Sequence, residues 1–212
     1  MNTRILLGSL ALVSALGLFL SAASSPSQAK PSAAPNPSGK YTVDTVHSTV
    51  LFRVKHMNAS WAFGRFNQVT GELSLNAASP EKSSVTVTIA TDSVDTGAPK
   101  REAALKGLEV FDVVQFPEAT FVSKSVKKSG EGKYAVDGEI TFRGIKKPLS
   151  VEFEQVGFSD TKMGVRIGFY GTFMLKRSDF GMKVVPEQLG DEVYVTVSLE
   201  GTQTETAGKD GK

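Results

Sequence analysis

Few side chains in this sequence could do chemistry on a substrate. Asp44, His47 and Ser48 are of the types that form a catalytic triad, in which an acid orients a histidine that takes a proton from a hydroxyl. In an extended segment, however, His47 and Ser48 point to opposite faces and cannot share a proton. Because geometry rather than residue type defines a triad, we predict no catalytic residues here.

The remaining inventory excludes several classes of site. The 212-residue chain has no Cys and two His, so disulfides, thiolate nucleophiles, zinc fingers, iron–sulfur clusters and three-imidazole metal centres are ruled out. Its 24 basic and 22 acidic side chains give a net charge of +2, and no segment concentrates Lys or Arg. We therefore expect no metal site, no cofactor and no nucleic-acid partner.

His56 is the histidine that could meet an apolar ligand. It shares the strand parity of Val50, Phe52 and Val54, so in an unbroken strand it points to the same face as these residues. Near a strand end it could hydrogen-bond the polar head of a ligand. The alternative is a core histidine that bonds to a backbone carbonyl, and the sequence leaves both interpretations open.

The first 29 residues are predicted to be an export signal. Arg4 is followed by a charge-free apolar run over residues 5–20, and residues 27–29 form a small-residue cleavage site, with residues 21–23 as an earlier candidate. The alternative interpretation is a membrane-spanning helix, but the run is shorter than the ~20 residues that such a helix needs. We expect a periplasmic location.

The mature chain divides into a folded unit between two polar ends. Residues 30–40 form a Pro/Ser-rich stretch that cannot bury enough apolar surface to order itself, so they are predicted to be a flexible tether. Residues 201–212 are predicted to be a disordered tail for the same reason. The folded domain is therefore expected over residues 41–200.

Period-two alternation predicts strands along nearly the whole of that domain. Val85, Val87 and Ile89 alternate with Thr, and Leu149, Val151 and Phe153 alternate with polar residues, so each strand has one apolar face. Turn residues separate such segments, for instance over residues 78–80, 129–132 and 157–160. Eight or nine strands are expected.

Closure of the sheet follows from the scarcity of helix. One segment, residues 98–106, is predicted to be helical, with Pro99 in its first turn and Gly107 at its end. One short helix cannot cover a large sheet, so the apolar faces must meet inside a barrel or a sandwich. We predict an all-β fold, an antiparallel up-and-down eight-stranded β-barrel with one short helix.

A barrel of this size is either filled by side chains or holds one slim ligand. The chain has 13 Phe against 4 Tyr and 1 Trp, and Phe has no polar tip, so the interior suits an apolar tail better than a sugar or nucleotide. The competing interpretation is that these Phe simply form a packed core.

A series of motifs lies in order along residues 41–200. They include an opening Tyr41-x-x-Asp44-x-x-His47-Ser48-x-Val50-x-Phe52-x-Val54-x-His56 followed by Ser60-Trp61-x-x-Gly64-x-Phe66, then Thr91-x-Ser93-Val94-Asp95-Thr96, Arg101-Glu102, Phe111-Asp112, Phe116-Pro117-x-Ala119-Thr120-Phe121, Gly138-x-Ile140-Thr141-Phe142-x-Gly144 and Arg177-x-Asp179-Phe180-Gly181. In this order and spacing the motifs resemble the YceI-like family of bacterial secreted polyisoprenoid-binding proteins.

This resemblance implies a lipocalin-like barrel that holds a long isoprenoid chain, such as a polyprenyl phosphate or an isoprenoid quinone, for carriage or sequestration without bond-making chemistry. It also makes a homodimer possible. Many relatives have a His where this chain has Ala104, so Arg101 or His56 would have to serve the head group instead. The expected ligand-binding residues are Phe52, Val54, His56, Trp61, Phe66, Arg101, Phe111, Phe169, Phe173 and Arg177.

Two other classes of function were weighed against lipid binding. An enzyme acting on a small substrate would use His56, Arg177 and Asp179, but the chain lacks paired carboxylates at a recognisable spacing. An outer-membrane barrel would need an apolar outer wall, whereas the second strand face carries Arg53, Lys55, Thr86, Thr88, Glu152 and Glu154. We therefore expect a soluble barrel that is not integral to the membrane.

Overall fold

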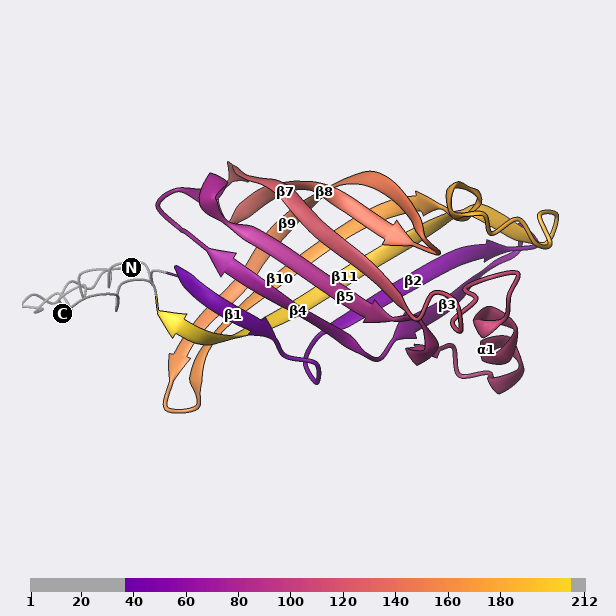
Figure 1. Cartoon of the computed structure of the whole chain (residues 1–212), viewed down its shortest axis with the longest axis horizontal. Coiled ribbons are helices and arrows are strands. Elements are labelled where there is room, and N and C mark those ends of the chain that lie inside the picture. The colour runs from indigo at the N-terminus through magenta and orange to yellow at the C-terminus, as the bar shows by residue number, and fades with distance from the viewer. Residues whose placement is uncertain (1–36, 207–212) are drawn as a thin grey trace, which may run out of the picture. The chain divides into compact units, whose positions relative to one another are not determined.

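An antiparallel sheet whose first and last strands pair with each other forms the wall of the protein (Figure 1). The computed structural model describes residues 37–206; the predicted signal peptide and most of the tether lie outside that range. The strands are β1 (Gly39–Val43), β2 (Thr49–His56), β3 (Ser60–Phe66), β4 (Val69–Leu75), β5 (Ser84–Ala90), β6 (Val94–Asp95), β7 (Glu118–Gly130), β8 (Lys133–Phe142), β9 (Ile145–Thr161), β10 (Gly164–Lys176) and β11 (Leu189–Thr206).

Three pairs of short strands act as single, interrupted strands of the wall. The long β11 pairs with β1 near its C-terminal end and with β2 near its N-terminal end, and β4 and β3 continue the wall beside β1 and β2. In the same way β5 pairs with β4, and β6 pairs with β3. Counted this way, the wall has eight positions in up-and-down order, which confirms the predicted barrel.

Side-chain alternation explains why the barrel has an apolar inside. On β9, Val151 and Phe153 are buried inside the wall, whereas Glu152 and Glu154 are exposed outside it. Most buried residues of the other strands join one hydrophobic cluster inside the barrel. The predicted polarity, apolar inside and polar outside, is confirmed.

Two predicted boundaries are wrong because strands continue through polar sequence. The tail predicted from Gly201 is strand as far as Thr206, where it pairs with β1. Gly39 and Lys40, assigned to the tether, lie on the other side of that pairing. The barrel closes only if a strand pairs with β1. The end of β11 does so through backbone hydrogen bonds, which need no large apolar side chains. The predicted turn over residues 157–160 is likewise part of β9.

Helix α1 (Pro99–Lys106) confirms the predicted helical segment. Pro99 is in the first turn and Gly107 ends the helix, its N–H bonded to the carbonyl of Ala104. The 3₁₀ turns η1 (Pro80–Lys82), η2 (Thr91–Ser93) and η3 (Arg177–Phe180) complete the helical elements of the described chain. Among residues 37–206, no helix is long and apolar enough to cross a bilayer.

The two ends of the barrel are built differently. Helix α1, the β2–β3 turn and the loop between β10 and β11 gather at one end, which we call the mouth (Figure 1). At the other end, the far end, Tyr41, Leu73 and Ile167 form a separate hydrophobic cluster inside the ring of β1, β4 and β10. The functional question is therefore what lies between these ends.

Candidate functional site

The barrel encloses a cavity of about 190 Å³ between its mouth and its middle. Thr120 and Arg177 are its polar lining residues, and all the others are apolar. The strand residues that line it include Val50, Phe52, Val54, Phe66, Val87, Phe121, Ile140, Phe142, Val151, Phe153, Phe173, Leu175, Val195 and Val197. The interior is thus hollow and apolar.

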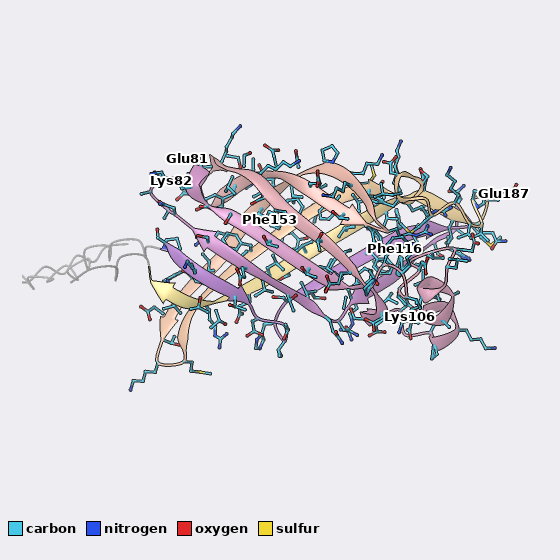
Figure 2. All side chains as sticks on the ribbon, in the orientation of Figure 1. Glu81, Lys82, Lys106, Phe116, Phe153 and Glu187 are labelled. Atoms are coloured by element: carbon cyan, nitrogen blue, oxygen red, sulfur yellow. The ribbon has the colours of Figure 1, made fainter. Side chains whose placement is uncertain are left out.

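Loops rather than strands close the mouth over this cavity. Leu105 comes from α1, Val110 and Phe111 from the segment that follows it, and Met182 and Val184 from the loop before β11. Figure 2 labels Lys106, Phe116 and Glu187 at this same end of the molecule. Because these segments belong to no strand ladder, they can shift without breaking the sheet.

A chain of phenylalanine rings crosses the barrel beneath these loops. Phe52 contacts Phe66 with ring centroids 5.6 Å apart, and Phe66 contacts Phe111 at 5.6 Å. Phe111 lies 5.5 Å from Phe142, which lies 5.7 Å from Phe180. Tilted ring pairs at these spacings are favourable contacts. The mouth is therefore sealed by aromatic side chains that come from both strands and loops.

Glycines opposite phenylalanines keep the lumen open. Gly171 pairs with Phe153 across β9 and β10, and a Cβ at Gly171 would lie 2.8 Å from the Phe153 ring. A Cβ at Gly138 would lie 2.5 Å from the Phe121 ring, and one at Gly64 would clash with the Phe52 ring. Without a side chain at the glycine, each ring lies flat against the wall and fills less of the interior.

A second cavity of about 50 Å³ lies toward the far end. It shares Val85, Phe153 and Leu199 with the larger cavity, so these three side chains separate the two spaces. Tyr134 and Phe169 line the smaller one and contact each other edge to face at 6.2 Å. Figure 2 labels Phe153 part of the way along the barrel, well away from the mouth.

Arg177 is buried at the mouth and bonded to backbone carbonyls. Only 8% of it is exposed. Its Nε donates to the carbonyl of Gly190 at 2.9 Å and its Nη2 to that of Leu189 at 3.0 Å. Its Nη1 donates to the carbonyls of Met182 and Val184 at 2.9 and 2.7 Å. These bonds hold the loop between β10 and β11 over the cavity.

Most of the predicted ligand-binding residues reach the lumen. Phe52, Val54, Phe66, Phe111, Phe173 and Arg177 line the larger cavity, and Phe169 lines the smaller one. Phe121, Phe142 and Phe153 were missed although their strand parity marks them as inward-facing. Phe180, Met182 and Leu105 were missed because no periodicity places a loop or helix residue.

Three of the predicted residues lie outside the cavity. His56 is the last residue of β2, paired with Ser60 and Leu189, and it is exposed although it shares the strand parity of the inward Phe52 and Val54. Trp61 is on the outer wall, because it has the opposite parity to the inward Phe66. Arg101 is exposed on α1. The structure therefore places none of these three in the cavity lining, and a role for them in binding stays a prediction.

The segment containing Asp44, His47 and Ser48 forms a polar cluster at the seam between β1 and β11. His47 Nδ1 lies 3.0 Å from Asp44 Oδ2, but Ser48 Oγ bonds to the backbone carbonyl of Glu200 at 3.4 Å and not to His47. Arg166 Nη1 donates to Asp44 Oδ2 and to Glu200 Oε1, at 3.1 and 3.0 Å. The guanidinium thus bridges the two carboxylates.

The hydrogen bond from His47, aided by backbone N–H groups, lowers the pKa of Asp44 to about 2. Oxygen and nitrogen atoms of Asp44, His47 and Glu200 lie within 4.8 Å of one another, a spacing that a metal ion could use. Arg166 already supplies a positive charge there, so we interpret the cluster as a structural one that links Asp44 and Glu200 through Arg166.

Comparisons with known proteins agree with this architecture. The model of the YceI-like domain matches residues 41–201. A UPF0312 protein of Shewanella sp. (strain W3-18-1) is 34% identical over 166 residues, covering 77% of this chain and 87% of the relative. A UPF0312 protein of Yersinia pestis (strain Pestoides F) is 37% identical over 158 residues, covering 74% and 82%.

Solved structures share the fold. Burkholderia cenocepacia BcnA superposes with a TM-score of 0.68 at 26% identity, covering 76% of this chain and 99% of BcnA. The Campylobacter jejuni YCEI protein gives 0.64 at 28% identity, covering 71% and 90%. A polyisoprenoid binding domain from Saccharophagus degradans gives 0.62 at 16% identity, covering 77% and 98%, and at that identity it supports the fold alone.

Proposed function

This chain belongs to the YceI-like family, and from that premise we propose that it binds an amphiphilic polyisoprenoid in the barrel lumen. The ligand would be a polyprenyl phosphate or an isoprenoid quinone, held for carriage or sequestration. The observation that carries the proposal is the hollow interior, whose lining is apolar except for Thr120 and Arg177.

The size of the cavity supports an apolar ligand that enters by displacing side chains. At about 190 Å³ it exceeds an engineered apolar cavity of ~150 Å³ that holds benzene. It is smaller than the ~300–1,000 Å³ of typical ligand sites. A long tail would therefore have to move the Phe153 ring and open the smaller cavity as well. Burial of the tail at ~25 cal/mol per Å² would supply the affinity.

The lining supports binding rather than catalysis. Within the described residues, no carboxylate and no imidazole lines the larger cavity. Its one ionisable side chain, Arg177, is already bonded to four carbonyls. Such a site offers no acid–base pair and no base that could activate the Thr120 hydroxyl, which bond-making chemistry would need. We propose a periplasmic location on the strength of the predicted export signal.

Organic extraction of protein purified from its host, followed by mass spectrometry, tests the proposal. We expect a polyprenol derivative or a quinone in the extract, and uptake of the same lipid by delipidated protein. An extract without lipid, together with no uptake of polyprenyl phosphate or ubiquinone, would contradict it.

Gly171→Ala supplies a variant for the uptake assay, with Gly168→Ala as its matched control. Both glycines are on β10, but Gly171 faces the Phe153 ring in the lumen. A Cβ at Gly168 would meet its nearest neighbour, Val156 on the outer wall, at an ordinary 3.5 Å. Uptake through the lumen predicts that only Gly171→Ala weakens binding.

A further inference from the structure

An aromatic and cationic cluster is found on the outer wall, over β2, β3 and β11. The rings of Trp61 and Tyr194 meet edge to face with centroids 5.5 Å apart. The guanidinium of Arg53 lies 4.6 Å from the Trp61 ring centroid and 5.2 Å from that of Tyr194. Lys55 Nζ lies 5.6 Å from the Trp61 ring. We call these four residues the outer cluster.

Exposed apolar side chains extend the outer cluster across four neighbouring strands. One row of the sheet runs from Met174 on β10 through Tyr194 and Arg53 to Phe63 on β3. Phe63 is 59% exposed, and Leu51 in the next row is 42% exposed. A contiguous exposed patch that joins aromatic, apolar and cationic side chains marks an interaction surface.

The positive charges of the outer cluster have no acidic partner in the described chain. Arg53 and Lys55 form no ion pair within residues 37–206, and their close contacts are with aromatic rings. The carboxylate of Glu192 accepts a hydrogen bond from the Tyr194 hydroxyl at 2.7 Å. The patch therefore presents cations available to an anionic surface.

The outer cluster lies beside the mouth of the barrel. Lys55 and Trp61 are paired near the β2–β3 turn. At the tip of that turn Met57 is 62% exposed, and its N–H donates to the carbonyl of Gln188 at 2.7 Å, in the loop that closes the mouth. Val185, on the same loop, is also exposed. The outer cluster and the exposed apolar side chains of Met57 and Val185 thus lie together beside the entrance to the cavity, at a place we call the corner of the mouth.

We propose that this corner docks on the surface of a bilayer that contains anionic phospholipid. Trp and Tyr favour the membrane–water interface, and Lys and Arg are attracted to anionic head groups. Met57, Phe63 and Val185 would enter the boundary of the acyl chains. The docking places the mouth against the lipid. This proposal concerns the surface to which the barrel binds and not the ligand inside the barrel, so it goes beyond the proposed function.

Charge favours a lipid surface over a second copy of the chain. The edge of β3 pairs with β6 only at Arg65 and Phe66, so Ser60–Gly64 could pair with the same edge of another copy. That arrangement would bring Arg53 and Lys55 of both copies toward each other, and like charges at an interface are unfavourable. Anionic lipid compensates the same charges.

Sedimentation with vesicles tests the proposal, using wild-type protein purified from its host and variants in the same form. One set of vesicles contains phosphatidylcholine alone, and the other also contains phosphatidylglycerol. We expect binding to the anionic vesicles and roughly tenfold weaker binding for Arg53→Gln/Lys55→Gln, because each cation contributes. Trp61→Ser/Phe63→Ser should weaken binding without changing its dependence on phosphatidylglycerol.

Lys127→Gln/Lys128→Gln is the matched control, since it removes the same charge from exposed positions on β7. Wild-type binding to neither vesicle, or an equal loss in this control, would overturn the proposal. So would self-association that the Trp61 and Phe63 substitutions abolish, which would assign the surface to a second copy. Uptake of polyprenol from solution by Arg53→Gln/Lys55→Gln should be unchanged, which separates this test from that of the proposed function.

Discussion

The two ends of the barrel are closed by different means. At the far end the closure is backbone pairing, and Tyr41, Leu73 and Ile167 are buried to within 1–2% exposure inside the ring of strands. At the mouth the closure consists of side chains from α1 and two loops, held by Arg177 and by a hydrogen bond from Arg143 Nη2 to the carbonyl of Leu108.

This difference indicates which end can open. Opening the far end would break several ladder hydrogen bonds and expose a packed cluster in one step. Opening the mouth would rotate aromatic rings and release loop contacts, while the sheet stays intact. A lipid tail is therefore expected to enter at the mouth, and the following substitutions separate the two ends.

The largest expected effect is on folding at the far end. Leu73→Ala should lower the free energy of unfolding by about 3 kcal/mol, because Leu73 is 2% exposed and borders only the smaller cavity of about 50 Å³. Leu175→Ala is the same change beside the larger cavity and should cost about 1 kcal/mol less. Urea denaturation measures both. An equal or larger loss for Leu175→Ala would mean that the two ends are packed alike.

Substitution of Arg177 should lower the free energy of unfolding less than Leu73→Ala does. It should have a larger effect on the entry of lipid through the mouth. Arg177→Met leaves four backbone carbonyls, two in the loop and two at the start of β11, without their donor, which should cost about 2 kcal/mol. Hydrogen exchange should quicken in residues 182–190 but not in β1 and β4, and lipid uptake should become faster. Exchange that quickens at both ends alike would show that Arg177 supports the whole barrel.

A methyl group in the lumen should change affinity more than stability. In Gly171→Ala the Phe153 ring must leave the wall, so we expect roughly tenfold weaker binding of a long polyprenol, about 1.4 kcal/mol. A short-tailed quinone that reaches no further than Phe153 should lose less. Titration of Gly171→Ala with both ligands measures these losses, and Gly168→Ala is the control. Equal losses of affinity for the long and the short tail would argue that Phe153 does not separate the two cavities.

The smallest expected effect is a pH dependence at the seam. The pKa of Asp44 falls from 3.8 to about 2 in the folded protein. A depressed folded pKa stabilises the protein above the unfolded pKa, and this contribution is lost as pH falls from about 4 to about 2.

Wild type should therefore exceed Asp44→Asn in unfolding free energy by ~1 kcal/mol at neutral pH, after allowance for solvent screening. That difference should shrink over the same acidic window, as followed by urea denaturation at several pH values. A difference that does not change with pH would assign the effect of Asp44→Asn to lost backbone hydrogen bonds instead.

The strands and their inward faces could be predicted from sequence because alternation is a local signal. Val151 and Phe153 follow it, and it also placed Phe52, Phe66 and Phe173 in the lumen. The same rule would have placed Trp61 outside, since it has the opposite parity to Phe66. Alternation sets the face of a side chain but not its burial at a strand end, where His56 is exposed.

The closure of the mouth could not be predicted in this way. Met182 and Val184 reach the cavity because Arg177 holds their loop, a long-range arrangement of backbone carbonyls that leaves no periodic trace. The extension of β11 to Thr206 was hidden for a related reason. Its residues are polar, and their order comes from pairing with β1 rather than from apolar burial.

The pairing of β11 with β10, β1 and β2 has a consequence for the order of folding. The wall cannot close until residues 189–206 have left the ribosome. Until then the apolar faces of the other strands have no enclosed interior to line. Contacts between the two ends of a chain form slowly, and open strand edges are prone to aggregate. The nascent barrel should therefore be a client for a chaperone until its last strand arrives.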